Sequence, residues 1–77
     1  MKKEVYNYYR LKVLSKASGS NVHHLNHLLG IILNGISNYN YYINSNKLKA
    51  KEIEKTVIKA ITNIYEMTGV TFSRDNW

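Results

Sequence analysis

The 77-residue sequence contains no cysteine and no proline, and its five acidic residues are outnumbered by eleven lysines and arginines. The absence of cysteine excludes a disulfide framework, a thiolate nucleophile and a cysteine-based zinc site. A small domain without disulfide bonds is compatible with the reducing cytoplasm, which is the location we predict. A chain this short buries only about 60% of its unfolded surface. We therefore expect one small domain, residues 1–77, that dimerises or docks on a partner.

The sequence also lacks a long apolar run. Its longest apolar stretch, 28–36, is interrupted by Gly30, Asn34 and Gly35 and is much shorter than the ~20 residues of a membrane-spanning helix. Lys2 and Lys3 resemble the basic start of a signal peptide, but no apolar segment follows them. We expect neither secretion nor stable membrane insertion. A small membrane-active or assembly peptide remains an alternative, because both flanks of the apolar stretch are basic.

Residues that commonly carry catalysis are few and scattered. Glu52 and Glu54 lie two positions apart and would point to different sides of a helix. Glu4, Glu66 and Asp75 are distant from them and from one another in the sequence. No serine lies beside an activating base in a known signature, and no glycine-rich phosphate loop is present. The sequence therefore predicts a protein that is not an enzyme and has no cofactor.

The net charge of +6 is unevenly distributed along the chain. Residues 1–16 hold five basic side chains and one acidic side chain, whereas residues 17–46 hold no Lys, Arg, Asp or Glu. Asparagine and histidine supply the polarity of this middle segment, and charges return from Lys47 onward. This pattern predicts a neutral packing element between two basic segments, and a basic protein of this kind suits an acidic partner.

Apolar residues of the middle segment recur at alternating spacings of three and four, which predicts a helix over 20–46. They are Val22, Leu25, Leu29, Ile32, Ile36, Tyr39 and Ile43. Ser20 or Asn21 is expected to cap its start. An interior glycine costs about 1 kcal/mol relative to alanine, whereas glycine is favourable just after a helix. We therefore expect a break near 34–37, with one continuous helix as the alternative.

The same spacing predicts a helix over 47–68, flanked by Ser45 or Asn46 as the N-cap and Gly69 as the stop. Its apolar positions are Ala50, Ile53, Val57, Ala60, Ile64 and Met67, with Ile61 and Tyr65 flanking the buried face. Residues 69–77 are expected to form a short tail, extended over 70–72 and unstructured around Trp77.

Residues 1–16 fit two patterns. Val5, Tyr9 and Val13 share one helical face, yet apolar and basic residues also alternate as in a strand. We predict a basic, tyrosine-rich helix over about 3–16. The alternative topology is a basic N-terminal strand followed by two helices, the strand pairing with residues 70–73 or with a second copy. The predicted fold class is all-α, a small bundle of three or four helices with a helical hairpin core.

Lysines at every fourth position form a candidate contact surface on the last helix. Lys47, Lys51, Lys55 and Lys59 make a stripe ~18 Å long at 1.5 Å rise per residue. Like charges at this spacing repel, and the helix dipole disfavours cations near the N-terminus. Helix stability therefore argues against this placement. The stripe is interpreted either as a solvated face or as a surface for phosphates or an acidic protein.

Two further groups are candidates for partner contact. The first comprises Arg10, Lys12 and Lys16, which are interleaved with tyrosines in a way that suits stacking on bases. The second comprises aromatic residues expected to contact a partner: Tyr8, Tyr41 and Trp77. Trp77 stands near Arg74 and would be an interface anchor.

His23 and His27 lie one helical turn apart, as two metal ligands on one helix would. A zinc site needs three or four protein ligands, and no carboxylate is near in the sequence. We interpret these residues and His24 as a solvent-exposed imidazole patch. A pH-responsive or phosphate-contacting patch and a metal shared across an oligomer are the alternatives.

These observations favour a small non-enzymatic binding protein that modulates or inhibits a larger partner, expected to be a nucleic-acid-processing or defence machine. A dimeric DNA- or RNA-binding regulator is the first alternative, and the membrane-active or assembly peptide is the second. Frequent Asn, Lys, Ile and Tyr are typical of a low-GC genome, which with the small size suggests a phage- or plasmid-encoded protein. A homodimer is expected, because the chain is too short to cover both main helices.

Overall fold

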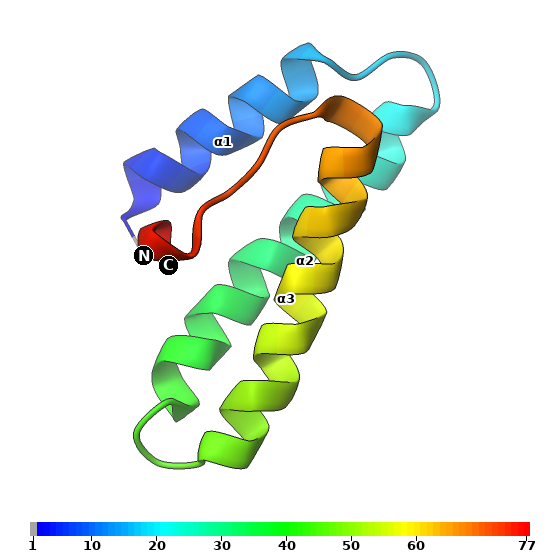
Figure 1. Cartoon of the computed structure of the whole chain (residues 1–77). Helices are drawn as coiled ribbons and strands as arrows, with labels where there is room; N and C mark the ends of the chain where they lie inside the picture. The colour runs from blue at the N-terminus through cyan, green and yellow to red at the C-terminus, as the bar shows by residue number, and fades with distance from the viewer. Residues whose placement is uncertain (1) are drawn as a thin grey trace.

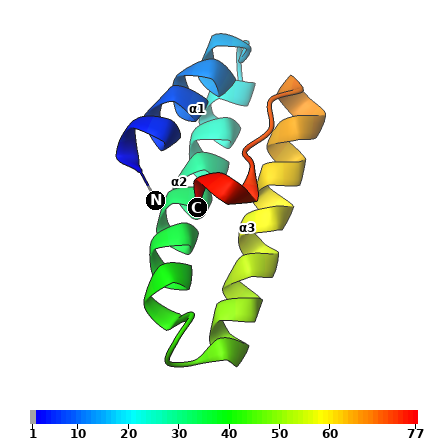
Figure 2. The same cartoon turned by 60° about the vertical axis from the view of Figure 1, so that its left-hand side comes forward.

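The computed structural model describes residues 2–77 and contains, within that range, three α-helices, one short 3-10 turn and no strand (Figure 1). The predicted all-α bundle is confirmed. Helices α2 and α3 form an antiparallel hairpin, and α1 and the C-terminal segment pack against one of its two ends (Figure 2). The elements are α1 (Lys3–Ser15), α2 (Asn21–Tyr42), α3 (Lys47–Thr68) and η1 (Arg74–Asn76).

Helix α2 runs through Asn34 and Gly35 without interruption, so the expected break near 34–37 is wrong. The reason lies on α3. A Cβ atom at position 35 would overlap Val57 Cγ2 and would also touch Ile53. Glycine at this position lets the two helices approach closely, and this tertiary packing overrides the propensity of about 1 kcal/mol that disfavours an interior glycine.

The N-terminal segment is the predicted helix and not the alternative strand. Helix α1 buries Tyr6, Tyr9 and Val13, which recur at the helical spacing of three and four. The Tyr6 hydroxyl donates a hydrogen bond of 2.9 Å to the carbonyl oxygen of Leu29 on α2. This bond joins α1 to the hairpin through the only polar group of Tyr6, and it satisfies that group inside the core.

Helix α3 begins and ends at the predicted residues because its signals are local. The Asn46 side chain accepts a hydrogen bond of 3.1 Å from the backbone N–H of Lys49. Gly69 has a left-handed conformation, with φ of 75°, and its N–H donates to the Tyr65 carbonyl. Helix α2 differs, because Ser20 holds the cap position without a side-chain hydrogen bond.

The core lies between α2 and α3, under α1. Two residues of α3 that we predicted on its buried side lie outside this core: Tyr65 is 52% exposed, and Met67 is also exposed. The ends of the α2 seam, Val22 and Ile43, are likewise exposed. The least accessible large side chains are Val13, Leu25, Leu29, Ile32, Ile36, Val57 and Ile64.

The C-terminal segment, residues 69–77, runs between α1 and α3 (Figure 1). Val70 and Phe72 are buried, and the Phe72 ring lies 4.6 Å from the Tyr9 ring between centroids. Residues near Trp77 form η1, and Trp77 is half-buried against the core. The expectation of an unstructured end is therefore wrong, because the apolar ring of Trp77 packs against Tyr39 and the core.

Candidate functional site

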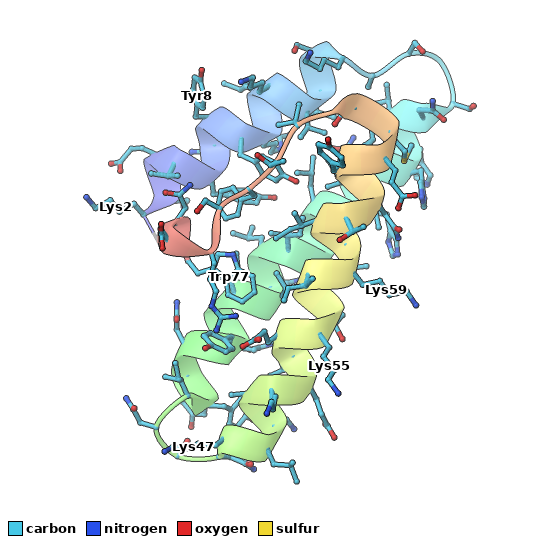
Figure 3. All side chains as sticks on the ribbon, viewed as in Figure 1. Lys2, Tyr8, Lys47, Lys55, Lys59 and Trp77 are labelled. Atoms are coloured by element: carbon cyan, nitrogen blue, oxygen red, sulfur yellow. The ribbon has the colours of Figure 1, made fainter. Side chains whose placement is uncertain are left out.

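The lysine stripe, Lys47, Lys51, Lys55 and Lys59, lies on the exposed side of α3. The residues that α3 buries against the rest of the fold, Ala50, Val57, Ala60 and Ile64, lie on its opposite face. Figure 3 shows Lys55 and Lys59 pointing away from α2, and Lys47 at the foot of the hairpin. The four lysines thus follow one another at one-turn intervals along α3, on a line that winds about 120° around the helix from Lys47 to Lys59.

None of these four lysines has a salt-bridge partner. Within residues 2–77 a single salt bridge is present, between Arg74 and Glu54 with an N–O distance of 2.7 Å. Hydrogen bonding from Arg74 lowers the pKa of the Glu54 carboxyl below its usual value. Glu54 is thus engaged by Arg74, although its charge also interacts with that of Lys51, and the neighbouring Glu52 forms no salt bridge within residues 2–77.

The second basic group does not form one surface. Arg10 and Lys12 are two positions apart on α1, which places them about 200° apart around the helix, while Lys12 and Lys16 share one side. All three side chains are exposed. In Figure 3 the α1 residue Tyr8 lies on the side of the molecule opposite Lys55 and Lys59. The two predicted basic groups are therefore separate surfaces.

The three candidate aromatic residues have different environments. Tyr8 on α1 is 70% exposed, and Tyr41 in the last turn of α2 is 75% exposed. Trp77 packs edge-on against Tyr39, with 5.4 Å between ring centroids, and the Arg74 guanidinium lies 5.0 Å from its ring. Trp77 thus serves packing within the fold, whereas Tyr8 and Tyr41 are open to a partner.

Arg74 connects the C-terminal segment to both helices of the hairpin. Its guanidinium donates hydrogen bonds of 2.7 Å to the Tyr39 hydroxyl on α2 and to Glu54 on α3. Beside it, a cleft of about 230 Å³ opens between the two helices. The sequence interpretation missed the structural role of Arg74, because its partners are distant in the sequence. The cleft is lined by Tyr39, Ile43, Lys47, Ala50, Lys51 and Glu54.

The hairpin tip, residues 38–51, projects beyond α1 and the C-terminal segment in both views (Figures 1 and 2). Its most exposed large apolar side chains are Tyr41 and Leu48, each 75% exposed. Tyr41 packs edge-on against Tyr42, and Lys49 Nζ lies 5.1 Å from the Tyr42 ring centroid. Two features of the sequence indicated an excess of positive charge at this tip. The uncharged segment 17–46 is followed directly by Lys47, and residues 5–51 contain no acidic side chain.

The three histidines are exposed on the first turns of α2, as the interpretation of an imidazole patch requires. Among residues 2–77 no group of three or more His, Asp or Glu side chains is arranged to hold a metal ion. His23 and His27 therefore have no third metal-ligating side chain beside them within residues 2–77.

No family model matches this chain, and neither a curated protein nor a solved structure shows significant similarity to it. Among residues 2–77 we find no helix whose length and apolar content would let it cross a membrane. The chemistry of the exposed surface is thus the basis for a functional proposal, and its two prominent features are the lysine stripe and the hairpin tip.

Proposed function

We propose that this protein is a non-enzymatic binding protein that attaches to an anionic surface of a larger, nucleic-acid-processing partner and modulates its activity. The observation that carries the proposal is the lysine stripe, four exposed lysines in one row without a salt bridge. Such a row is complementary in charge to a phosphate backbone or an acidic protein face.

The position of the stripe supports a role outside the fold. Lys47 and Lys51 lie in the first turns of α3, where the helix dipole is unfavourable for cations. Neighbouring lysines four residues apart repel by a few tenths of a kcal/mol per pair. A bound anionic partner would offset both unfavourable effects. The stripe is therefore better explained by binding than by the stability of α3.

Affinity capture from a low-GC bacterial lysate, with and without nuclease, tests this function. The wild-type chain is compared with a variant in which the four stripe lysines are glutamine, and with a control that changes Arg10, Lys12 and Lys16 to glutamine. We expect one defined protein partner that survives nuclease, is retained by the control and is lost by the stripe variant. Recovery of no protein partner by the wild type contradicts the proposal.

Self-association is a second proposal, favoured by α1. Tyr8 and Leu11 lie one turn apart on its outer face and are 70% and 64% exposed. Two such faces packed together would remove this apolar surface from water in a homodimer. Light scattering at high micromolar concentration is expected to give twice the chain mass, and Leu11→Glu is expected to give a monomer. A wild-type monomer contradicts it. A nucleic-acid-processing partner would place the protein in the cytoplasm, which stays a prediction.

A further inference from the structure

A cleft between α2 and α3 has a buried apolar floor. Its volume is about 190 Å³, and the floor is formed by Leu28 of α2 and Ala60 of α3, which are 5% and 3% exposed. Half-buried Ile31 lines it on the α2 side, and Thr56 and Asn63 line it on the α3 side. Within residues 2–77, neither α1 nor the C-terminal segment contributes a lining residue. The cleft is therefore an open apolar surface of the hairpin itself.

The α3 side of this cleft continues as a row along the helix. Its side chains recur at spacings of four, three and four, as they do along one face of a helix. They are Thr56, Ala60, Asn63 and Met67, and they span about 17 Å at 1.5 Å rise per residue. Met67 is 37% exposed and adds apolar surface one turn beyond the cleft. A surface of this length between two helices suits a third helix better than a small ligand.

Lys59 is the only charged residue that lines the cleft within residues 2–77. Its neighbours on the helix surface, the positions three and four residues before and after it, hold no carboxylate, and α2 contains no acidic residue. Glu52 and Glu54 are instead such neighbours of Lys55 and Lys51. Figure 3 shows Lys59 extending from α3 into solvent. The cleft thus combines an apolar floor with one positive charge at its edge that no adjacent carboxylate offsets.

We propose that this cleft receives an acidic amphipathic helix of the protein partner, with an apolar side chain in the cleft and a carboxylate one turn away on Lys59. The inference rests on the proposed function, because it identifies the chemistry of the protein face that the lysine stripe contacts. A phosphate backbone has no apolar group for the floor. A second copy of the chain, with its net charge of +6, would bring like charges together at Lys59.

Titration of the isotope-labelled chain with a synthetic helical peptide of about 20 residues, followed by NMR, tests the inference. The peptide carries leucine and glutamate one turn apart on the same face. One control peptide has glutamine in place of the glutamates, and the other has asparagine in place of the leucines. We expect saturable shifts of amide resonances concentrated at the cleft. The glutamine peptide should bind about three- to five-fold more weakly, and the asparagine peptide at least about ten-fold more weakly.

Substitutions in the chain separate the charge from the apolar floor. Lys59→Gln is expected to lower the affinity for the peptide about two- to five-fold. Lys12→Gln removes the same charge from a separate surface on α1 and should change the affinity less than about 1.5-fold. Ile31→Ala is expected to cost about three-fold or more, with Ile58→Ala as its control, since Ile58 is 45% exposed on α3 and does not line the cleft. Circular dichroism verifies that each variant is folded.

Several outcomes would overturn the inference. Shifts spread evenly along the stripe, with equal losses of affinity for Lys47→Gln and Lys59→Gln, would indicate attraction of charges without a docking site. Equal binding of all three peptides, or no saturable binding, contradicts it as well. Shifts at the cleft that depend on protein concentration without any peptide would assign the cleft to a second copy. In each of these cases the affinity capture still decides the proposed function, since its readout is a nuclease-resistant protein partner.

Discussion

At one end of the α2–α3 hairpin, α1 and the C-terminal segment bury Tyr9 and Phe72 against each other; at the other end, Tyr41 and Leu48 remain exposed beside Lys47. The covered end contains the Tyr9–Phe72 ring contact and the buried Tyr6 hydrogen bond. The tip holds three lysines and exposed amides, and Tyr39 at its inner edge contacts Arg74 and Trp77 of the C-terminal segment. Folding stability and ligand binding are therefore expected to depend on different parts of one hairpin, and substitutions can separate them.

The largest expected effect is on stability at the covered end. Phe72→Ala removes a buried ring and is expected to lower the free energy of unfolding by about 3–5 kcal/mol. This is comparable to the whole stability that a core of this size supplies, about 3–5 kcal/mol. Urea titration followed by circular dichroism should show a mostly unfolded chain. Leu48→Ala at the tip is the control, expected within about 0.5 kcal/mol of the wild type. Similar losses for both variants would contradict the division between the two ends.

The second prediction compares the stability effects of replacing two glycines of α2. Gly35→Ala places a Cβ atom against Val57 and is expected to destabilise the fold by about 1–3 kcal/mol through overpacking. Gly30→Ala meets nothing within 4 Å and is expected to stabilise α2 by about 0.5–1 kcal/mol. Thermal unfolding of the two variants is the measurement. A stabilising Gly35→Ala would show that α2 and α3 do not approach closely at that point.

Alkaline pH should weaken the covered end. Burial raises the pKa of Tyr6 above its ordinary value of 10.0, against the opposing charge of Arg10. Burial also raises the pKa of Tyr9, and the charge of an ionised Tyr6 adds to this effect. The folded chain thus retains protons that the unfolded chain releases. The corresponding stability is complete below pH 10 and is lost as the pH rises through the raised pKa values.

Tyrosinate absorbance and circular dichroism, recorded together from neutral to strongly alkaline pH, check this behaviour. Loss of helix should accompany ionisation of the last tyrosines. The Tyr6→Phe variant loses the hydrogen bond to Leu29, about 0.5–1.5 kcal/mol at neutral pH, and its stability should then depend less on alkaline pH. Full ionisation of all tyrosines with an unchanged helix signal would contradict burial of Tyr6 and Tyr9.

The smallest effect is expected at the Arg74 contacts, which lie between the two ends. Arg74 holds the pKa of Glu54 below its usual value, so the pair adds stability above that usual value of 4.5, and this contribution is lost as the pH falls. Because the Arg74 side chain is about half exposed and solvent screens the pair, Glu54→Gln should change the unfolding midpoint only slightly, and only above about pH 4.5. A variant that differs from the wild type equally at acidic and neutral pH would indicate lost packing and not lost charge.

The sequence predicted features with local causes. Asn46 and Gly69 fixed the ends of α3, and the spacing of Tyr6, Tyr9 and Val13 correctly predicted α1. Gly35 was misinterpreted because the reason for its presence is Val57 on another helix. Trp77 was wrongly expected in an unstructured tail for the same reason, since Tyr39, against which it packs, is remote in the sequence.

The candidate site was predicted in part. The lysine stripe follows directly from the helical repeat, and the structure adds that these lysines share an exposed face without salt bridges. The hairpin tip could not be derived in this way, because Tyr41 and Leu48 belong to different helices and their exposure depends on how the other elements pack on the hairpin. Arg10 and Lys12 show the reverse case, since neighbours in sequence lie on opposite flanks of α1.

The contact between Tyr9 and Phe72 has a consequence for the order of folding. The α2–α3 hairpin closes through a loop of a few residues, 43–46, and can form early because little chain entropy is lost. Docking of Phe72 on Tyr9 joins residues near opposite ends of the chain, and we expect it to follow hairpin formation because it closes a much longer loop. Amide hydrogens of the hairpin are therefore expected to become protected before those of α1 as the nascent chain folds.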